Sequence, residues 1–168
     1  MNYVTLPLTD LRVSQVCLGT GHFGGIFTQD DDFALMDEFL RLGGNFIDSA
    51  HVYCNWIPGP RSSSERMIGN WLTARGVRDQ MIIATKGAHP ELGSMHIPRM
   101  SRAEISQDVD ESLEYLQTDR IDLYFLHRDV PNRAVGEIVD SLNTQVDAGK
   151  IRYFGASNWT PTRLQAAQ

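Results

Sequence analysis

Apolar and polar positions follow two alternating periods along this chain, and the alternation predicts a regular β/α succession. Short apolar runs of strand character lie near Val16 and then around residues 45–50, 80–86, 121–127 and 151–158. Between these runs, apolar residues recur every three or four positions, as they do on one face of a helix. Strands that alternate regularly with helices predict right-handed crossovers and a parallel sheet.

Turn and cap residues mark where the predicted helices begin. Thr28 is a predicted N-cap for a helix over residues 30–42, which Gly43-Gly44 should stop. Ser62 with Glu65, and Ser101 with Glu104, each fit a capping box. Thr160 followed by Pro161 predicts one more helix start. Residues 3–14, with two β-prone pieces around Thr9-Asp10, predict a small hairpin ahead of the first buried strand, VCLGT.

Length, charge and hydropathy narrow the class of protein. The chain has 168 residues, a normal size for one domain, and its formal net charge is −6. Because no run of Lys and Arg is present, we expect neither a nucleic-acid partner nor a membrane surface. No apolar stretch is long enough to span a bilayer and the first ten residues lack signal-peptide order, so we expect a cytoplasmic protein. Cys17 and Cys54 are too few for a disulfide framework and lack zinc-ligand spacing, which predicts free thiols.

The predicted strands each deliver a polar residue at the carboxyl end. Asp48 ends one strand and Tyr53 follows it, while Lys86 and His127 end the next two. Ser157 and Asn158 then end the last strand. Because the carboxyl ends of parallel strands meet at one rim, these side chains should converge at the mouth of one pocket.

Asp48, Tyr53, Lys86 and His127 have complementary chemistry. Each alone has an ordinary structural explanation, since an acid at a strand end is usually hydrogen-bonded and a buried histidine is usually core. Together they form a proton donor: an ammonium favours the ionised form of an adjacent phenol, and a carboxylate keeps that ammonium charged. An imidazole opposite can donate to a carbonyl oxygen. The set therefore predicts reduction of a carbonyl group.

Residues 19–24 offer a competing interpretation, because they match the G-x-G-x-x-G pattern of dinucleotide-binding folds, with Asp48 roughly where a ribose-binding acid belongs. In that fold the last glycine opens a helix whose dipole meets the pyrophosphate. Here Gly25 to Thr28 intervene before the helix begins. The pattern also leaves Tyr53, Lys86 and His127 without a task, so we favour a flexible loop that a ligand approaches closely.

With these residues in place, the sequence closely resembles the aldo-keto reductase superfamily. The resemblance runs from the N-terminal hairpin to the last strand through the segments LGTGHFGG, NFIDSAHVY, ERMIG, ATK, TDRIDLYFLHRDVP and GKIRYFGASNW. It implies a (β/α)8 TIM barrel with an N-terminal hairpin, binding NADP(H) without a Rossmann fold. It also implies reduction of small aldehydes or ketones to alcohols.

The resemblance assigns roles to individual residues. Tyr53 would be the general acid, Lys86 and Asp48 its partners, and His127 would orient the substrate carbonyl. Ser157 and Asn158 would hold the nicotinamide carboxamide. The residues near the nicotinamide and its ribose would be Gly19, Thr20, Gly21 and Asp48.

The sequence departs from the family in two places. Cys54 stands where the family often has glycine after the tyrosine, and an insertion, Asn55 to Arg61, follows it on the substrate side. The resemblance stops after the fifth barrel strand, so residues 1–168 form one C-terminally incomplete domain without the family's later cofactor contacts. We expect an open barrel with two unpaired edge strands, which favours self-association or a completing chain.

Two other functions remain open from the sequence. An aldo-keto-reductase-like protein that is not catalytic could bind a partner chain with the same fold. A metal-dependent barrel hydrolase is disfavoured, because none of the five histidines has an H-x-H or H-E-x-x-H spacing. We therefore expect no metal.

Overall fold

The computed structural model describes the whole chain, Met1–Gln168, and confirms the predicted β/α succession. Strands β1 (Tyr3–Thr5) and β2 (Arg12–Ser14) pair as an antiparallel hairpin. Five parallel strands form the main sheet in the sequential order β3-β4-β5-β6-β7. Their bounds are Leu18–Gly19, Phe46–Asp48, Ile82–Gly87, Ile121–Leu126 and Ile151–Ala156. This sequential order, with β3 and β7 both at an edge, is that of an unclosed TIM-type barrel rather than of a Rossmann fold.

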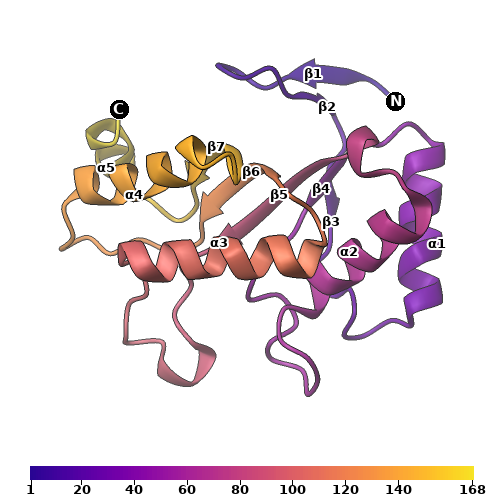
Figure 1. The fold of residues 1–168 in the computed structure, drawn as a ribbon, viewed down its shortest axis with the longest axis horizontal. Coiled ribbons are helices and arrows are strands. Elements are labelled where there is room, and N and C mark those ends of the chain that lie inside the picture. The colour runs from indigo at the N-terminus through magenta and orange to yellow at the C-terminus, as the bar shows by residue number, and fades with distance from the viewer.

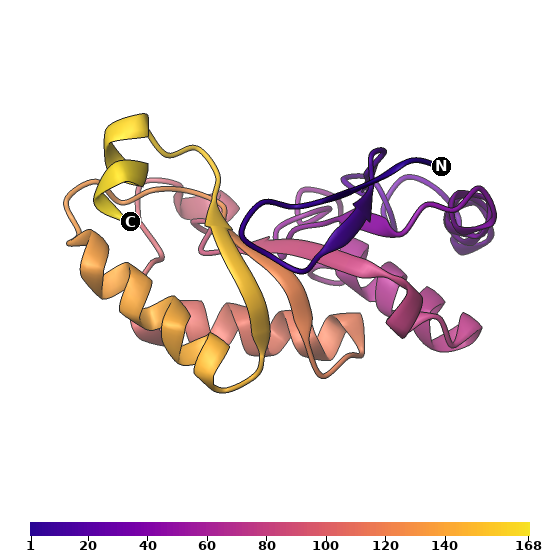
Figure 2. The same cartoon turned by 90° about the horizontal axis from the view of Figure 1, so that it is seen from above.

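Five α-helices follow the strands of the sheet. Their bounds are Gln29–Arg41 (α1), Ser63–Arg75 (α2), Arg102–Leu116 (α3), Val135–Asp147 (α4) and Pro161–Ala166 (α5). Two short 3-10 helices, Arg78–Gln80 and Leu92–Ser94, lie in loops. Figures 1 and 2 show α3 and α4 side by side along one face of the sheet, with α2 next to α3. Every helix is too short or too polar to span a lipid bilayer.

The main core lies between the sheet and the helices. Buried Ile47 and Ile83 from the strands meet Ile68 and Trp71 from α2, together with Val109 from α3. Helices α2 and α3 approach closely because position 69 is glycine: a Cβ there would lie 2.2 Å from the backbone oxygen of Tyr115. The predicted apolar helix faces are therefore the faces that pack.

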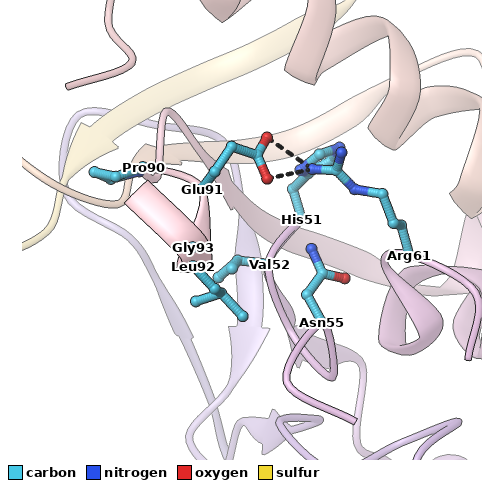
Figure 3. A pocket seen from close by; sticks show the side chains of 8 residues that line it. All are labelled: His51, Val52, Asn55, Arg61, Pro90, Glu91, Leu92 and Gly93. Atoms are coloured by element: carbon cyan, nitrogen blue, oxygen red, sulfur yellow. Dashed lines mark hydrogen bonds and ion pairs between the residues drawn. The ribbon is translucent and has the colours of Figure 1, made fainter. Parts of the chain in front are cut away.

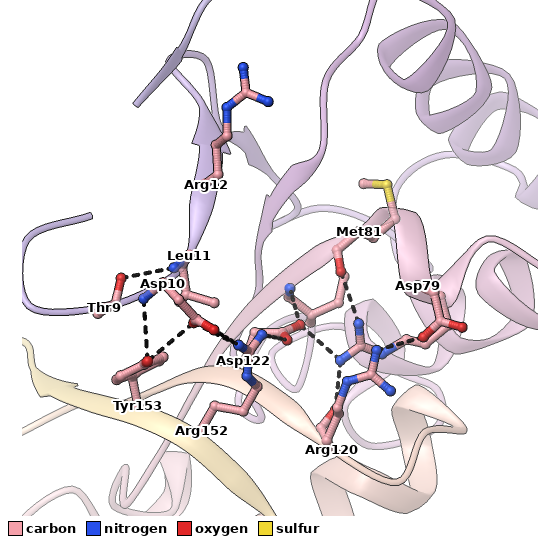
Figure 4. Close-up of polar contacts among 12 residues, drawn as sticks. Thr9, Asp10, Leu11, Arg12, Asp79, Met81, Arg120, Asp122, Arg152 and Tyr153 are labelled. Atoms are coloured by element: carbon pink, nitrogen blue, oxygen red, sulfur yellow. Dashed lines mark hydrogen bonds and ion pairs between the residues drawn. The ribbon is translucent and has the colours of Figure 1, made fainter. Parts of the chain in front are cut away.

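The hairpin covers the amino-terminal end of the opposite, inner face. Its Leu11 and Val13 form a small core with Ala84 and Leu123. Figure 4 shows the polar contacts that hold it, in which Arg152 joins Asp10 at 2.7 Å and Asp122 at 3.1 Å. The inner face beyond the hairpin is only partly covered, with half-buried side chains that include Phe46, Phe125 and Tyr153.

Helix caps were predicted well except at one site. Thr28, Ser101 and Thr160 each accept a hydrogen bond from the first turn of their helix, and the first two form complete capping boxes. Ser62 does not: it adopts a left-handed conformation, φ 55°, and makes no capping bond. Its hydroxyl instead donates to the backbone oxygen of His51 at 2.6 Å, which ties down the preceding loop.

The first strand also differs from the prediction. The apolar pattern predicts a buried strand from Val16, but β3 is only two residues long and Val16 is 56% exposed. The physical reason is its position at the edge of an open sheet, where no strand covers it on the other side.

Candidate active site

Strands β4, β5 and β6 end together, at the rim opposite the hairpin (Figure 1). Their register pairs Asp48 with Ala84 and Lys86 with Phe125. Because side chains alternate between the faces of a strand, Asp48, Lys86 and the residue after β6, His127, point to the inner side. The structure thus brings these three predicted residues together, with Tyr53 beside them.

Lys86 is the centre of the group. Its Nζ lies 2.7 Å from both carboxylate oxygens of Asp48, 2.6 Å from the backbone oxygen of Ser49 and 3.2 Å from the hydroxyl of Tyr53. An ammonium has three N–H groups, and here each has a partner. The Lys86 side chain is 12% exposed, which makes this one of the more buried ion pairs of the molecule.

Tyr53 comes from the turn after β4. Its N–H donates to the backbone oxygen of Ala50 at 2.9 Å. The next residue, Cys54, has a positive φ of 66°, a conformation that glycine adopts most readily. Buried Cys54 directs its thiol at the backbone oxygens of Gly21 and Phe23 at 3.4 and 3.3 Å, so it fixes this loop against the loop after β3. Both thiols, Cys17 and Cys54, are free.

His127 lies across from Tyr53, with the ring centroids 6.0 Å apart and the rings edge to face. Its Nδ1 is buried without a hydrogen-bond partner. Burial, and then the positive charges of His89, Lys86 and Arg128, lower the pKa of His127 to about 3. The imidazole is therefore neutral at physiological pH and can donate from only one nitrogen.

Gly19, Thr20 and Gly21 line the rim beside β4. A Cβ built at either glycine would meet nothing within 4 Å, so open space lies over this stretch. Thr20 differs from them, since it is fully buried and its hydroxyl bonds to the backbone oxygen of Asp48 at 2.9 Å and to Ser64 at 2.8 Å. The Thr20 hydroxyl therefore makes its hydrogen bonds within the protein and not to a ligand.

Ser157 and Asn158 follow β7 at the same rim. The Asn158 amide donates to the backbone oxygen of His127 at 2.8 Å and to the Ser157 hydroxyl at 3.1 Å. Asn158 is exposed and has a φ of 64°. These bonds use its NH2 group and leave its carbonyl oxygen free to accept a hydrogen bond from a ligand.

The insertion after Tyr53 forms part of a separate pocket of about 250 Å³, between the loops that follow β4 and β5. Figure 3 shows Arg61 of the first loop bound to Glu91 of the second, at 2.9 and 3.1 Å. This pocket is not lined by any residue of the group around Lys86, namely Asp48, Tyr53, Lys86 and His127. Trp56, in the same insertion, is 51% exposed and lies edge-on to Tyr53 at 6.3 Å between centroids.

Sequence reasoning missed a second polar cluster, on the helix side of β5 and β6. Glu65 of α2 is fully buried and accepts a 2.5 Å bond from Thr85, while its other oxygen has no partner. Tyr124 lies near it, also fully buried and with an unpaired hydroxyl. Burial raises the pKa of Glu65, and burial with the nearby carboxylates raises that of Tyr124 well above its ordinary range. We call Glu65, Thr85 and Tyr124 the outer cluster.

One group of possible metal ligands lies near the outer cluster. His51, Asp108 and Glu111 bring their ligand atoms within 4.8 Å of one another. Their atoms already have partners: His51 Nε2 contacts Glu111 at 2.7 Å, and Asp108 binds Arg99 at 2.7 Å and the backbone N–H of Ala88 at 2.7 Å. A guanidinium beside Asp108 opposes a second cation there.

Sequence reasoning also missed His89 and Trp56. Neither ends a strand, so the rule that found the rim residues could not select them. The signal for Trp56 was its place in the insertion Asn55 to Arg61, and the signal for His89 was its proximity in sequence to Lys86.

Comparisons with known proteins agree on one family. The family model described as Aldo/keto reductase family matches residues 15–168. Norsolorinic acid reductase stcV of Emericella nidulans is 36% identical over 92% of this chain and 42% of its own length. The oxidoreductase YrpG of Bacillus subtilis is 36% identical over 100% of this chain and 52% of its own.

A solved structure gives the same result. The holo form of aldo-keto reductase AKR11C1 from Bacillus halodurans has a TM-score of 0.83 and 32% identity, covering 98% of this chain and 53% of that one. The chain thus spans about half the length of the relatives it matches. It belongs to the aldo/keto reductase family of oxidoreductases.

Proposed function

We propose that this chain carries the carbonyl-reducing site of an NADP(H)-dependent oxidoreductase that converts aldehydes or ketones to alcohols, with Tyr53 as the general acid. The observation that carries the proposal is the position of Lys86 Nζ, which bonds to Asp48 and to the Tyr53 hydroxyl at once. We propose the same substrate class, aldehydes or ketones, for the whole protein.

The hydrogen-bond pattern supports this role for Tyr53. Lys86 donates to the tyrosine oxygen, and no protein acceptor receives the tyrosine proton. That proton is therefore free to pass to a carbonyl oxygen at the rim. The ammonium then stabilises the phenolate that remains, while Asp48 balances the charge of the ammonium.

His127 would hold the substrate. As a neutral imidazole it can donate one hydrogen bond to the carbonyl oxygen, which lets it orient the carbonyl without competing with Tyr53 as the acid. The exposed edge-on ring of Trp56 adds an apolar wall next to Tyr53. We infer that carbonyl compounds with an aromatic or bulky apolar substituent suit the site best.

NADP(H) fits the rim residues that the sequence indicated. Asn158 offers a free carbonyl oxygen beside His127, and Ser157 lies next to it, as a carboxamide requires. Open space over Gly19 and Gly21 lets a ring and ribose approach this stretch of backbone. Thr20 would hold the stretch in place, since its N–H bonds to the backbone oxygen of Asp48 at 3.0 Å, and the Asp48 carboxylate lies on the neighbouring strand. When bound, this cofactor supplies the hydride that reduces the carbonyl carbon.

A binding role is the second candidate, and the open sheet favours it. Strands β3 and β7 have unpaired edges, and Phe46, Phe125 and Tyr153 are half-buried on the inner face. Such a surface favours association with a second copy or a completing chain. In that case the chain would act as a non-catalytic subunit that binds a partner.

Two measurements test the proposal. Saturating NADPH should raise the thermal midpoint of the chain, because a ligand that binds only the folded state stabilises it. Tyr53→Phe should lower NADPH-dependent reduction of an aromatic aldehyde by on the order of 10²–10⁴-fold while leaving the NADPH-induced shift unchanged. Tyr124→Phe is the matched control and should keep full activity. Turnover that persists in Tyr53→Phe would show that the general acid is a different residue.

A further inference from the structure

His89 lies directly beside His127, although 38 residues separate them in sequence. Their ring centroids are 5.0 Å apart and the rings meet at 61°. His89 is buried, and its Nδ1 lies 2.7 Å from the backbone oxygen of Pro90. A carbonyl oxygen only accepts, so this nitrogen of His89 carries a hydrogen. The orientation of the His89 ring is therefore set by its own loop and not by His127.

The backbone that carries His89 is anchored to helix α3. The preceding residue, Ala88, has a φ of 56° and donates its N–H to Asp108 at 2.7 Å. Asp108 is itself held by Arg99 at 2.7 Å and its side chain is 1% exposed. The N–H of His127 bonds to the backbone oxygen of Gly87 at 2.8 Å. Both histidines are thus fixed relative to the end of β5.

The two nitrogens of His127 differ in their surroundings. Nδ1 is buried with no partner, whereas Nε2 is neither bonded nor fully buried. A buried N–H without an acceptor is rarer in proteins than a buried acceptor without a donor. The single hydrogen of the neutral ring is therefore favoured on Nε2.

Other groups also face this pair and affect its charge. Titratable or charged groups around His127 are Lys86, Tyr53, His89 and Arg128. Those around His89 are Arg128, Glu91 and Asp108. The cations near His127 outnumber the anions, so a proton added to His127 is opposed by its neighbours. Around His89 the charges are mixed: burial and Arg128 oppose a proton there, whereas Glu91 and Asp108 favour one.

We propose that His89 is a positioning residue for His127: its ring fills the space beside His127, keeps water from Nδ1, and so holds His127 neutral with its hydrogen on Nε2. Only the consequence for catalysis rests on the proposed function, because the tautomer of His127 is a property of the folded chain. If that function holds, His89 sets the direction of the bond that His127 donates to the substrate carbonyl.

Side-chain ¹⁵N NMR of the full chain tests this directly, since neutral tautomers and the imidazolium give distinct nitrogen shifts. His127→Gln identifies the His127 signals. The wild-type chain should show the Nε2–H tautomer between pH 5 and 8. His89→Phe keeps a ring in place and should preserve that spectrum, as should His96→Ala, which removes an exposed histidine of the same loop.

His89→Ala opens the space and should let water reach Nδ1. We expect the titration midpoint of His127 to rise by about 1–2 pH units, or its two tautomers to become mixed. If this variant does not fold, His89→Leu leaves a smaller gap and should shift the signals in the same direction. An unchanged His127 in the folded variant would overturn the proposal, as would a shift in His89→Phe as large as that in His89→Ala.

Activity gives a separate reading. If NADPH-dependent reduction is measurable, His89→Ala should lower kcat about tenfold or more, with a smaller change in KM, whereas His89→Phe should retain most of it. If neither the wild type nor any variant reduces a carbonyl, the proposed function fails. The NMR result still decides the role of His89 in that case. Equal kcat in wild type and His89→Ala, with turnover present, would contradict the positioning role.

Discussion

Two neighbouring residues of β5 take part in very different polar groups. Lys86 points to the inner face, where it joins Asp48 and Tyr53. Thr85 points to the helix side, where it joins Glu65 near Tyr124. Each group contains a carboxyl and a phenol, but only the inner one has an ammonium and an opening to the rim. The outer cluster is sealed under α2 and α3, and burial raises the pKa of both its carboxyl and its phenol.

The difference shows that residue types alone do not make a catalytic group. An ammonium beside a phenol stabilises the phenolate, whereas buried carboxylates facing a phenol destabilise it. The pKa shifts of Glu65 and Tyr124 are both upward, mainly because of burial. The outer cluster therefore contributes to the packing of α2 and α3 against the sheet, and the inner group is the candidate for chemistry.

The largest expected effect comes from exchanging the two β5 neighbours for apolar residues of similar size. Lys86→Met should lower NADPH-dependent carbonyl reduction by on the order of 10²–10⁴-fold, because Tyr53 loses the charge that stabilises its phenolate. Thr85→Val should leave the activity unchanged but lower the free energy of unfolding by about 1–3 kcal/mol, since the buried Glu65 loses its donor. Steady-state assays and urea unfolding measure the two effects. Equal activity losses in both variants would remove the distinction between the two groups.

A smaller effect should appear in the pH dependence of stability, through His127. Its pKa is about 3 in the folded chain and near 6.5 when unfolded, so the unfolded chain binds more protons between these values. The contribution of His127 to the free energy of unfolding should therefore rise with pH across this window and level off above pH 6.5, by about 1–2 kcal/mol between pH 5 and 7.5. His127→Gln should remove that rise in urea unfolding measured at both pH values. If the free energy of unfolding of His127→Gln changed with pH as much as that of the wild type, His127 would not be the group with the lowered pKa.

The outer cluster should give a change of the opposite sign. The raised pKa of Glu65 means that the folded chain binds more protons above pH 4.5, so this group stabilises the fold most at low pH and less as pH rises toward its folded pKa. The glutamine side chain of Glu65→Gln does not titrate. The variant should therefore become more stable relative to the wild type as the pH increases from 5 to 8. Thermal midpoints of both proteins across this range provide the measurement. A relative stability that does not change with pH would mean that Glu65 is ionised in the fold.

Local signals in the sequence predicted much of the fold. Capping residues placed the starts of α1, α3 and α5, because a cap bonds to an N–H only two or three residues away. The same logic was wrong at Ser62, where Asn55 and His51 compete for the backbone and hydroxyl groups that a capping box would use. Hydrogen bonds from Ser62 to the preceding loop thus replaced the capping bonds to the first turn of α2.

The sequence by itself determined the order of strands and helices and the residues at the carboxyl end of each strand. Period and side-chain chemistry are local properties, and they were enough to select Asp48, Tyr53, Lys86 and His127. Only the tertiary structure decided which polar groups are sealed and which remain open. Glu65 and Thr85 lie 20 residues apart, and His89 meets His127 from a different loop. Burial and electrostatic environment arise when distant segments pack, so no local pattern could separate the sealed outer cluster from the open group at the rim.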